Sequence, residues 1–173
     1  MKKIYCILAL VALVLPLRAQ VLGGSFKALQ GQNRVNFEVD YSEASIHGMS
    51  EEDFGDYEYD WYKDKREVTA IIVNECNERC RRAITVGRYD KSPYLIKVVI
   101  RAISSKGDFD FDAYLLDEEG KQLGSIENLW GKGGRFGTKL NLIKDGAESA
   151  GKNLGIALRT AILKGKVYRE DLY

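Results

Sequence analysis

The chain of 173 residues is close to electrically neutral, with 26 Lys and Arg residues against 25 Asp and Glu residues. Its length and its hydrophobic fraction of 45% are those of one globular domain that buries a core without needing a metal or a disulfide framework. The balance of charges argues against nucleic-acid binding, because nucleic-acid binders usually carry a basic excess.

The N-terminal segment has the pattern of a secretory signal peptide. Lys2 and Lys3 precede an apolar run of about 14 residues, and the segment closes on the small residue Ala19. The run is too short to span a bilayer, which takes about 20 residues. We therefore predict a signal peptide over residues 1–19 and a single α+β domain over residues 20–173. The protein is expected to be exported to the periplasm or the medium, with no transmembrane segment after the signal is removed.

The first predicted strand and helix follow in the next third of the chain. Apolar and polar side chains alternate from Val35 to Tyr41, which is the period of a half-buried strand. Ser50, with acidic residues directly after it, is typical of a helix start, because its hydroxyl can cap free N–H groups. The helix is predicted most firmly over residues 63–83. Its apolar stripe predicts packing on a sheet and consists of Val68, Ile71, Ile72, Cys76, Cys80, Ala83 and Ile84.

Four further strands and a last helix complete the predicted fold. The strands are expected at residues 85–89, 94–104, 108–117 and 122–130, and the helix at residues 140–163. In that helix Ala147, Gly151 and Gly155 recur every four residues, so one flank allows close approach of a neighbour. The elements predict an α+β two-layer sandwich: one mainly antiparallel sheet of about five strands, two helices on one face, and the order β-α-β-β-β-β-α.

A glycine-rich stretch, WGKGGRFGTK at residues 130–139, lies between the last strand and the last helix. A nucleotide-binding P-loop needs Gly-Lys followed by Ser or Thr, whereas residues 137–139 read Gly-Thr-Lys. We therefore interpret the glycines as a tight turn from sheet to helix and expect no nucleotide and no cofactor. An anion site at the helix start, assisted by Lys132 and Arg135, is the alternative.

Two cysteines, Cys76 and Cys80, remain after the signal is removed. Residues four apart on a helix hold their Cβ atoms about 5–6 Å apart, whereas a disulfide needs roughly 3.5–4.5 Å. Buried thiols are favoured, and a strained local disulfide stays open. A zinc site needs about four ligands, and the chain has a single histidine, so no metal is expected.

The side of the sheet turned away from the helices is the predicted binding surface. If alternate residues of the strand at 94–104 face the helices, the others face outward, and the same holds for the strand at 108–117. The outward set mixes charged and aliphatic side chains, which indicates cross-strand ion pairs or an interaction surface. The candidate binding residues are Leu95, Lys97, Val99, Arg101, Ile103, Asp110 and Asp112.

Several stretches carry a resemblance to known proteins: the signal ending in Ala-Gln, VNFEVDYS at 35–42, SEEDF at 50–54, and WGKGGRFGTKLNLIKDGAESAGKNLG at 130–155. With them the chain resembles a group of small secreted proteins of unknown function, mainly from Gram-negative gut bacteria. The resemblance covers nearly the whole exported chain and implies no catalytic residue. The order of elements is also similar to that of the periplasmic lipopolysaccharide-assembly lipoprotein family and of small envelope-assembly domains. This chain departs from that family because Cys6 lies inside the apolar run, where it cannot serve as a lipid anchor.

These observations predict a non-catalytic binding or assembly protein of the bacterial envelope. It is expected to engage a protein partner or itself through the open sheet face or the sheet edge, and to bind no nucleic acid. The alternative is a carboxylate-dependent hydrolase of a glycan or peptide, which needs two acids with separated pKa values; the candidate acids are Glu38, Asp40, Asp110 and Asp112. Carriage of an apolar ligand would require a cavity between helices and sheet, where the glycine flank predicts close contact instead.

Overall fold

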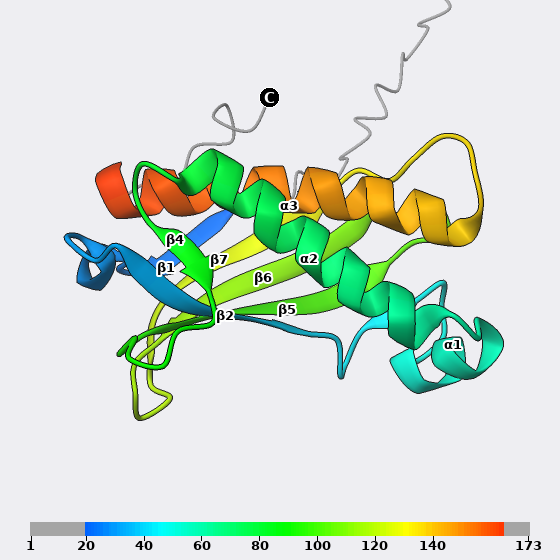
Figure 1. Cartoon of the computed structure of the whole chain (residues 1–173), viewed down its shortest axis with the longest axis horizontal. Coiled ribbons are helices and arrows are strands. Elements are labelled where there is room, and N and C mark those ends of the chain that lie inside the picture. The colour runs from blue at the N-terminus through cyan, green and yellow to red at the C-terminus, as the bar shows by residue number, and fades with distance from the viewer. Residues whose placement is uncertain (1–19, 165–173) are drawn as a thin grey trace, which may run out of the picture.

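The computed structural model describes residues 20–164, so the predicted signal peptide lies outside the described residues. One layer is a sheet and the other consists of two long helices that lie side by side on the same face of that sheet (Figure 1). In chain order the elements are β1 (Val21–Gly24), the 3-10 helix η1 (Lys27–Leu29), β2 (Arg34–Asp40), β3 (Ser45–Ile46), α1 (Glu51–Tyr57), α2 (Trp61–Cys80), β4 (Thr85–Gly87), β5 (Leu95–Ile103), β6 (Phe109–Leu116), β7 (Gln122–Gly131) and α3 (Lys139–Lys164).

The sheet has seven strands in the order β1-β7-β6-β5-β2-β4, and β3 also pairs with β5. The pairs β1–β7, β7–β6 and β6–β5 are antiparallel, whereas β5–β2, β2–β4 and β3–β5 are parallel. The α+β sandwich is thus confirmed, but the prediction of about five mainly antiparallel strands was incomplete. The helical crossover returns the chain to the end of the sheet at which β2 began, so β4 pairs parallel with β2. The short strands β1 and β3 carry too few residues to show a period.

The first helical region divides into two helices. Ser50 caps α1 as predicted, because its Oγ accepts a hydrogen bond from the N–H of Asp53 at 3.1 Å. The chain then turns, and α2 begins at Trp61, a fully buried side chain that meets Phe54 edge-on with ring centroids 5.2 Å apart. Aromatic packing therefore joins α1 to the start of α2. None of the helices within residues 20–164 combines the length and the hydropathy that a membrane-spanning helix requires.

The two long helices contact each other through backbone rather than through large side chains. A Cβ added at Gly151 would lie 2.7 Å from the carbonyl oxygen of Ile72, and one at Gly155 would lie 2.5 Å from that of Cys76. The predicted glycine flank of α3 is therefore the surface that meets α2. Cys76 and Cys80 are buried free thiols at this level of the helix pair, with their Sγ atoms 3.9 Å apart.

The glycine-rich stretch between β7 and α3 packs closely against its surroundings. A Cβ at Gly131 would lie 2.6 Å from the backbone N of Ala150, and one at Gly133 would overlap the carbonyl oxygen of Lys106. The N–H of Lys132 donates to the Oγ of Ser149 at 2.9 Å. These contacts support the interpretation of the glycines as structural, since side chains at these positions would push the loop away from the body of the domain.

Candidate functional site

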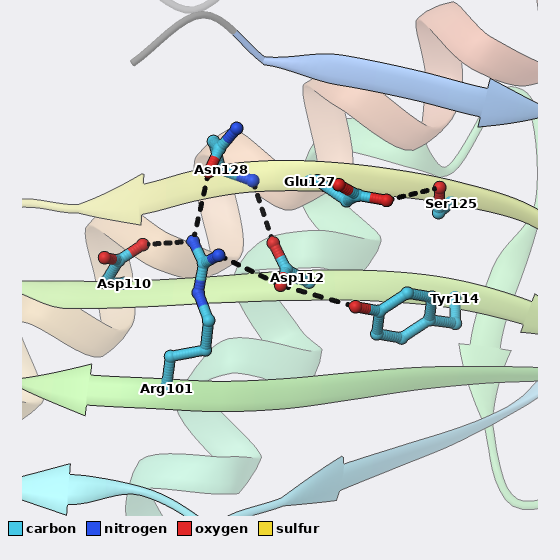
Figure 2. Close-up of polar contacts among 7 residues, drawn as sticks. All are labelled: Arg101, Asp110, Asp112, Tyr114, Ser125, Glu127 and Asn128. Atoms are coloured by element: carbon cyan, nitrogen blue, oxygen red, sulfur yellow. Dashed lines mark hydrogen bonds and ion pairs between the residues drawn. The ribbon is translucent and has the colours of Figure 1, made fainter. Parts of the chain in front are cut away.

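The face of the sheet opposite the helices is covered by no described element, and it carries most of the predicted binding residues. Figure 2 views this face, with the helices behind the strands. Leu95, Lys97 and Val99 of β5 alternate with fully buried residues and are half-buried. Asp110 and Asp112 of the adjacent β6 likewise alternate with buried phenylalanine and alanine. The structure therefore brings these predicted residues onto one surface.

Ile103 was wrongly placed on this face by the sequence analysis, because its side chain is only 1% exposed and lies in the core. The pairing of β5 with β6 shifts between Ile100 and Ala102, so Arg101 is an extra residue in the strand. A bulge of one residue reverses which side chains face the core beyond it. Ile103 therefore points toward the helices, as Ile100 does.

The bulge directs Arg101 into a cluster with the two aspartates of β6. Its Nη2 lies 2.5 Å from Oδ1 of Asp110, and its Nη1 lies 3.2 Å from Oδ2 of Asp112. Nη2 also lies 3.5 Å from Oδ1 of Asn128, so the guanidinium reaches from β5 across β6 to β7 (Figure 2). We call Arg101, Asp110, Asp112 and Asn128 the arginine cluster. One guanidinium thus ties three strands together.

A second irregularity, in β7, completes the cluster. Asn128 has a φ of 60°, a left-handed conformation that asparagine tolerates better than most residues. The pairing of β6 with β7 shifts at this level, between Phe111 and Ala113. The N–H of Asn128 donates to Oδ1 of Asp112 at 2.8 Å. The side chain of Asp112 is only 8% exposed although it lies on the open face. Its carboxylate is contacted by both Arg101 and Asn128.

Tyr114 lies beside the cluster and donates its hydroxyl to Oδ2 of Asp112 at 3.4 Å. Partial burial, and then the nearby charges of Asp112 and Glu127, raise the pKa of Tyr114 above its ordinary value. Its hydroxyl therefore stays protonated and acts as a donor. Glu127 in turn accepts a hydrogen bond from the Oγ of Ser125 at 3.1 Å (Figure 2).

A separate ion pair joins β2 to β5 on the same face. Nζ of Lys97 lies 2.8 Å from Oδ2 of Asp40. The hydrogen bond from Lys97, followed by one from the backbone of Ser42, lowers the pKa of Asp40 from 3.8 to about 2. The same hydrogen bond raises the pKa of Lys97. Both groups are therefore charged throughout the physiological range.

The Asp40–Lys97 pair predicts a small loss of stability in acid. A carboxyl group whose pKa is lowered by folding stabilises the fold above its unfolded pKa, near 4, and loses that effect as the pH falls toward about 2. Because the pair is partly exposed, Asp40→Asn should lower the free energy of unfolding by no more than about 1 kcal/mol at pH 7. The difference from wild type should shrink by pH 2.5 in urea denaturation. Glu38→Gln, which neutralises an exposed carboxylate on the same strand, serves as the control. If the free energy of unfolding of Asp40→Asn differs from that of wild type by the same amount at pH 7 and at pH 2.5, the assignment is contradicted.

One member of the arginine cluster, Asn128, and its neighbour Glu127 could not be identified from the sequence. Asn128 and Glu127 follow a strand pattern without any sign of the irregularity that turns Asn128 toward Asp112. Asparagine in a strand is uncommon, and that was the only local signal.

The aliphatic part of the face was anticipated: Leu95 of β5 pairs with Leu116 of β6, and both are half-buried.

The candidate acids of this face do not form one cluster. Asp110 and Asp112 hold an arginine, and the acids of β2 lie two strands away, roughly 10 Å at the usual strand spacing. The pKa of Asp40 is lowered, opposite to what a general acid requires. Among residues 20–164, no group of three or more His, Cys, Asp or Glu side chains is placed to hold a metal ion.

No protein-family model matches the chain, and no curated protein is similar to it. The similar solved structures include two of PelC from Paraburkholderia phytofirmans, both described as dodecamers. The first is a point variant of PelC and is 10% identical to this chain. The match covers 79% of this chain and 92% of that chain, with a TM-score of 0.42. The second has 13% identity, 79% and 93% covered, and a TM-score of 0.39.

A third similar structure is protein XCC0632 from Xanthomonas campestris, described under the family model DUF330. It has 12% identity, 84% of this chain and 95% of that chain covered, and a TM-score of 0.43. The resemblance to secreted proteins of gut bacteria and to lipopolysaccharide-assembly lipoproteins, drawn from the sequence, stays an expectation.

Proposed function

We propose that this chain is a non-catalytic, exported binding protein of the bacterial envelope, and that a partner protein docks on the open sheet face. The observation that carries the proposal is an uncovered face on which aliphatic side chains adjoin charged groups already held in place. Export is part of the proposal and rests on the sequence pattern of residues 1–19.

The aliphatic part of the face supplies the apolar contact that protein interfaces need. Leu95, Val99 and Leu116 lie on adjacent strands β5 and β6 and are half-buried. Figure 1 shows no helix or strand on this side of the sheet. Covering them with a partner would remove apolar surface from water, worth about 25 cal/mol per Å². A mixed surface of this kind is typical of interfaces between proteins that also exist separately.

The charged part of the face is pre-organised. Arg101 is bound to two aspartates, and Lys97 is bound to Asp40, so their side chains lose little conformational freedom when a partner arrives. Ion pairs on a rigid sheet favour specificity, since a partner must match their positions. The hydrolase alternative receives no comparable support, because Asp40, Asp110 and Asp112 are bound by Lys97 or Arg101. Glu38, the fourth candidate acid, is exposed and cannot by itself supply an acid and a base.

Site-specific cross-linking in the cells that produce the protein tests the proposal. A photo-reactive phenylalanine derivative replaces Tyr114, which lies half-buried on the open face. In a control it replaces Phe136, which is 88% exposed in the loop before α3 and lines neither proposed surface. We expect protein adducts from position 114 and none from position 136. The mass of the adduct distinguishes a second copy of this chain from a different protein.

A surface variant makes the cross-linking test specific. Val99→Lys introduces a charge into the apolar part of the face, while its cross-strand neighbours Asp40 and Asp112 can accommodate a cation. The yield of adducts from position 114 should fall at least five-fold in this variant. Equal yields with and without Val99→Lys, or no adduct from position 114, would refute docking on the open face.

A further inference from the structure

A second surface lies near the edge of the sheet farthest from β1, between β2 and helix α2. It is an open groove of about 650 Å³. One wall is β2 and the residues that follow it, the opposite wall is α2, and one end is where β4 stops, at Gly87 and Arg88. We call this surface the edge groove; its lining is distinct from the residues of the arginine cluster.

The edge groove exposes backbone that has no partner strand. β4 pairs with β2 only over Arg34 to Asn36, and no described strand follows on that side. The side chain of Asn36 ends the pairing, because its Oδ1 accepts the N–H of Tyr89 at 2.7 Å and turns the chain away. The following part of β2, from Phe37 to Asp40, is therefore a free sheet edge.

The direction of the free backbone groups follows from the pairing on the other side. The N–H of Asn36 donates to the carbonyl of Tyr94, so alternate residues of β2 face β5. Val39 is an odd number of residues from Asn36, so its N–H and C=O point away from β5 and into the edge groove. Exposed backbone of this kind is a template for an additional strand.

Apolar side chains line the edge groove from both walls, among charged ones. Val39 faces the edge groove from β2, and Ala70 and Val73 face it from α2. Tyr41 lies beneath them, buried and held by a hydrogen bond of 3.2 Å between its hydroxyl and Oγ1 of Thr69. An extended chain running along the edge would therefore place alternate side chains against an apolar wall.

The charges that line the edge groove are unevenly matched. Asp40 is paired with Lys97, and Glu51 is paired with Lys65 at 2.7 Å. By contrast, the exposed guanidiniums of Arg66 and Arg88 and the exposed carboxylate of Glu38 have no hydrogen-bond or ion-pair partner among residues 20–164. The edge groove therefore keeps two unpaired cations against one unpaired anion. Arginine binds carboxylates in a planar, bidentate manner, so the edge groove offers two unoccupied sites for acidic groups.

From these contacts we propose that the edge groove binds an extended peptide segment of a partner protein, which adds to the edge of β2 as a further strand. The segment carries aliphatic side chains at alternate positions and a carboxylate that meets Arg66 or Arg88. The free edge from Phe37 to Asp40 spans roughly 10 Å, enough for about four extended residues. This site deepens the proposed function but does not depend on the open face.

Titration of the exported chain with peptide pools tests this site. The probe is a pool of acetylated octapeptides with valine or leucine at alternate positions and Asp or Glu near one end; a second pool has Lys in place of the acids. NMR amide signals should move at Val39 and Val73 with the acidic pool, and the amide of Val39 should exchange more slowly. The acidic pool should bind at least five-fold more tightly than the basic pool.

Two matched variants locate the binding. Ala70 is exposed on α2 and lines the edge groove, so Ala70→Trp should fill it and weaken binding at least ten-fold. Asn74 is exposed one turn later and does not line the edge groove, so Asn74→Trp should leave binding unchanged. Val99→Lys, on the open face, should also leave peptide binding unchanged, which separates this proposal from docking on the open face.

Two results would overturn the edge-groove proposal. One is the absence of any movement of the Val39 amide signal with either pool up to millimolar concentration. The other is equal affinity of wild type and Ala70→Trp for the acidic pool. Neither result bears on the adducts formed from position 114, so the two proposals fail independently.

Discussion

Replacing Arg101 with methionine is expected to lower the free energy of unfolding by about 2–3 kcal/mol at pH 7. The side chain of Asp112 is 8% exposed, and Arg101 is the cation that it contacts at 3.2 Å. Without Arg101, the carboxylate keeps its contacts with Asn128 and Tyr114 but stays largely buried with its charge uncompensated. Urea denaturation followed by circular dichroism measures the loss.

A double-variant cycle separates charge from packing in this prediction. Asp112→Asn removes the charge and retains a side-chain oxygen for the N–H of Asn128, so the double variant with Arg101→Met should recover at least half of the loss. Lys97→Met breaks the pair with Asp40, whose carboxylate is more exposed than that of Asp112, and should cost no more than about 1 kcal/mol. Equal losses in Arg101→Met and Lys97→Met would contradict a specific role for the arginine cluster.

Valine at position 155 is expected to destabilise the fold by about 3 kcal/mol, because the helix interface has no room for its side chain. A Cβ at Gly155 would lie 2.5 Å from the carbonyl oxygen of Cys76 and 2.7 Å from Cβ of Arg79. The backbone carbonyl cannot move aside as the end of a flexible side chain does. The free energy of unfolding of Gly155→Val, measured in urea, tests the close contact between α2 and α3.

A solvent-facing position on the same helix provides the control for Gly155→Val. Glu148 is exposed on α3, and Glu148→Val adds a β-branched residue to the helix without crowding α2. Its cost should stay below about 1 kcal/mol, from lower helix propensity and the loss of a surface ion pair with Lys152. A loss in Gly155→Val no larger than in Glu148→Val would show that the helices do not meet at this glycine.

These two variants also bear on the proposed binding. Arg101 contributes to the open face, so its replacement should disturb docking as well as stability. Gly155 lies between the helices, so its replacement should act on docking only through the fold. Peptide binding at the edge groove should survive Arg101→Met wherever the variant remains folded, since Arg101 does not line that groove.

The amino-acid sequence alone determined the local features of this protein. Alternation in β5 and β6 placed Lys97, Val99 and Asp112 on one surface, and the four-residue spacing in α3 identified the flank at Gly155 that meets α2. The serine cap of α1 was also evident. Each of these features depends on residues close together in the chain, so the period or the spacing itself carries the information.

Tertiary structure alone decided how distant segments meet. The bulge at Arg101 buries Ile103, and its position depends on pairing with β6 rather than on the sequence of β5. The parallel pairing of β2 with β4, and its end at Asn36, create the edge groove. Register and strand order arise from contacts between residues far apart in the chain, where one shifted residue reverses the face of every side chain beyond it.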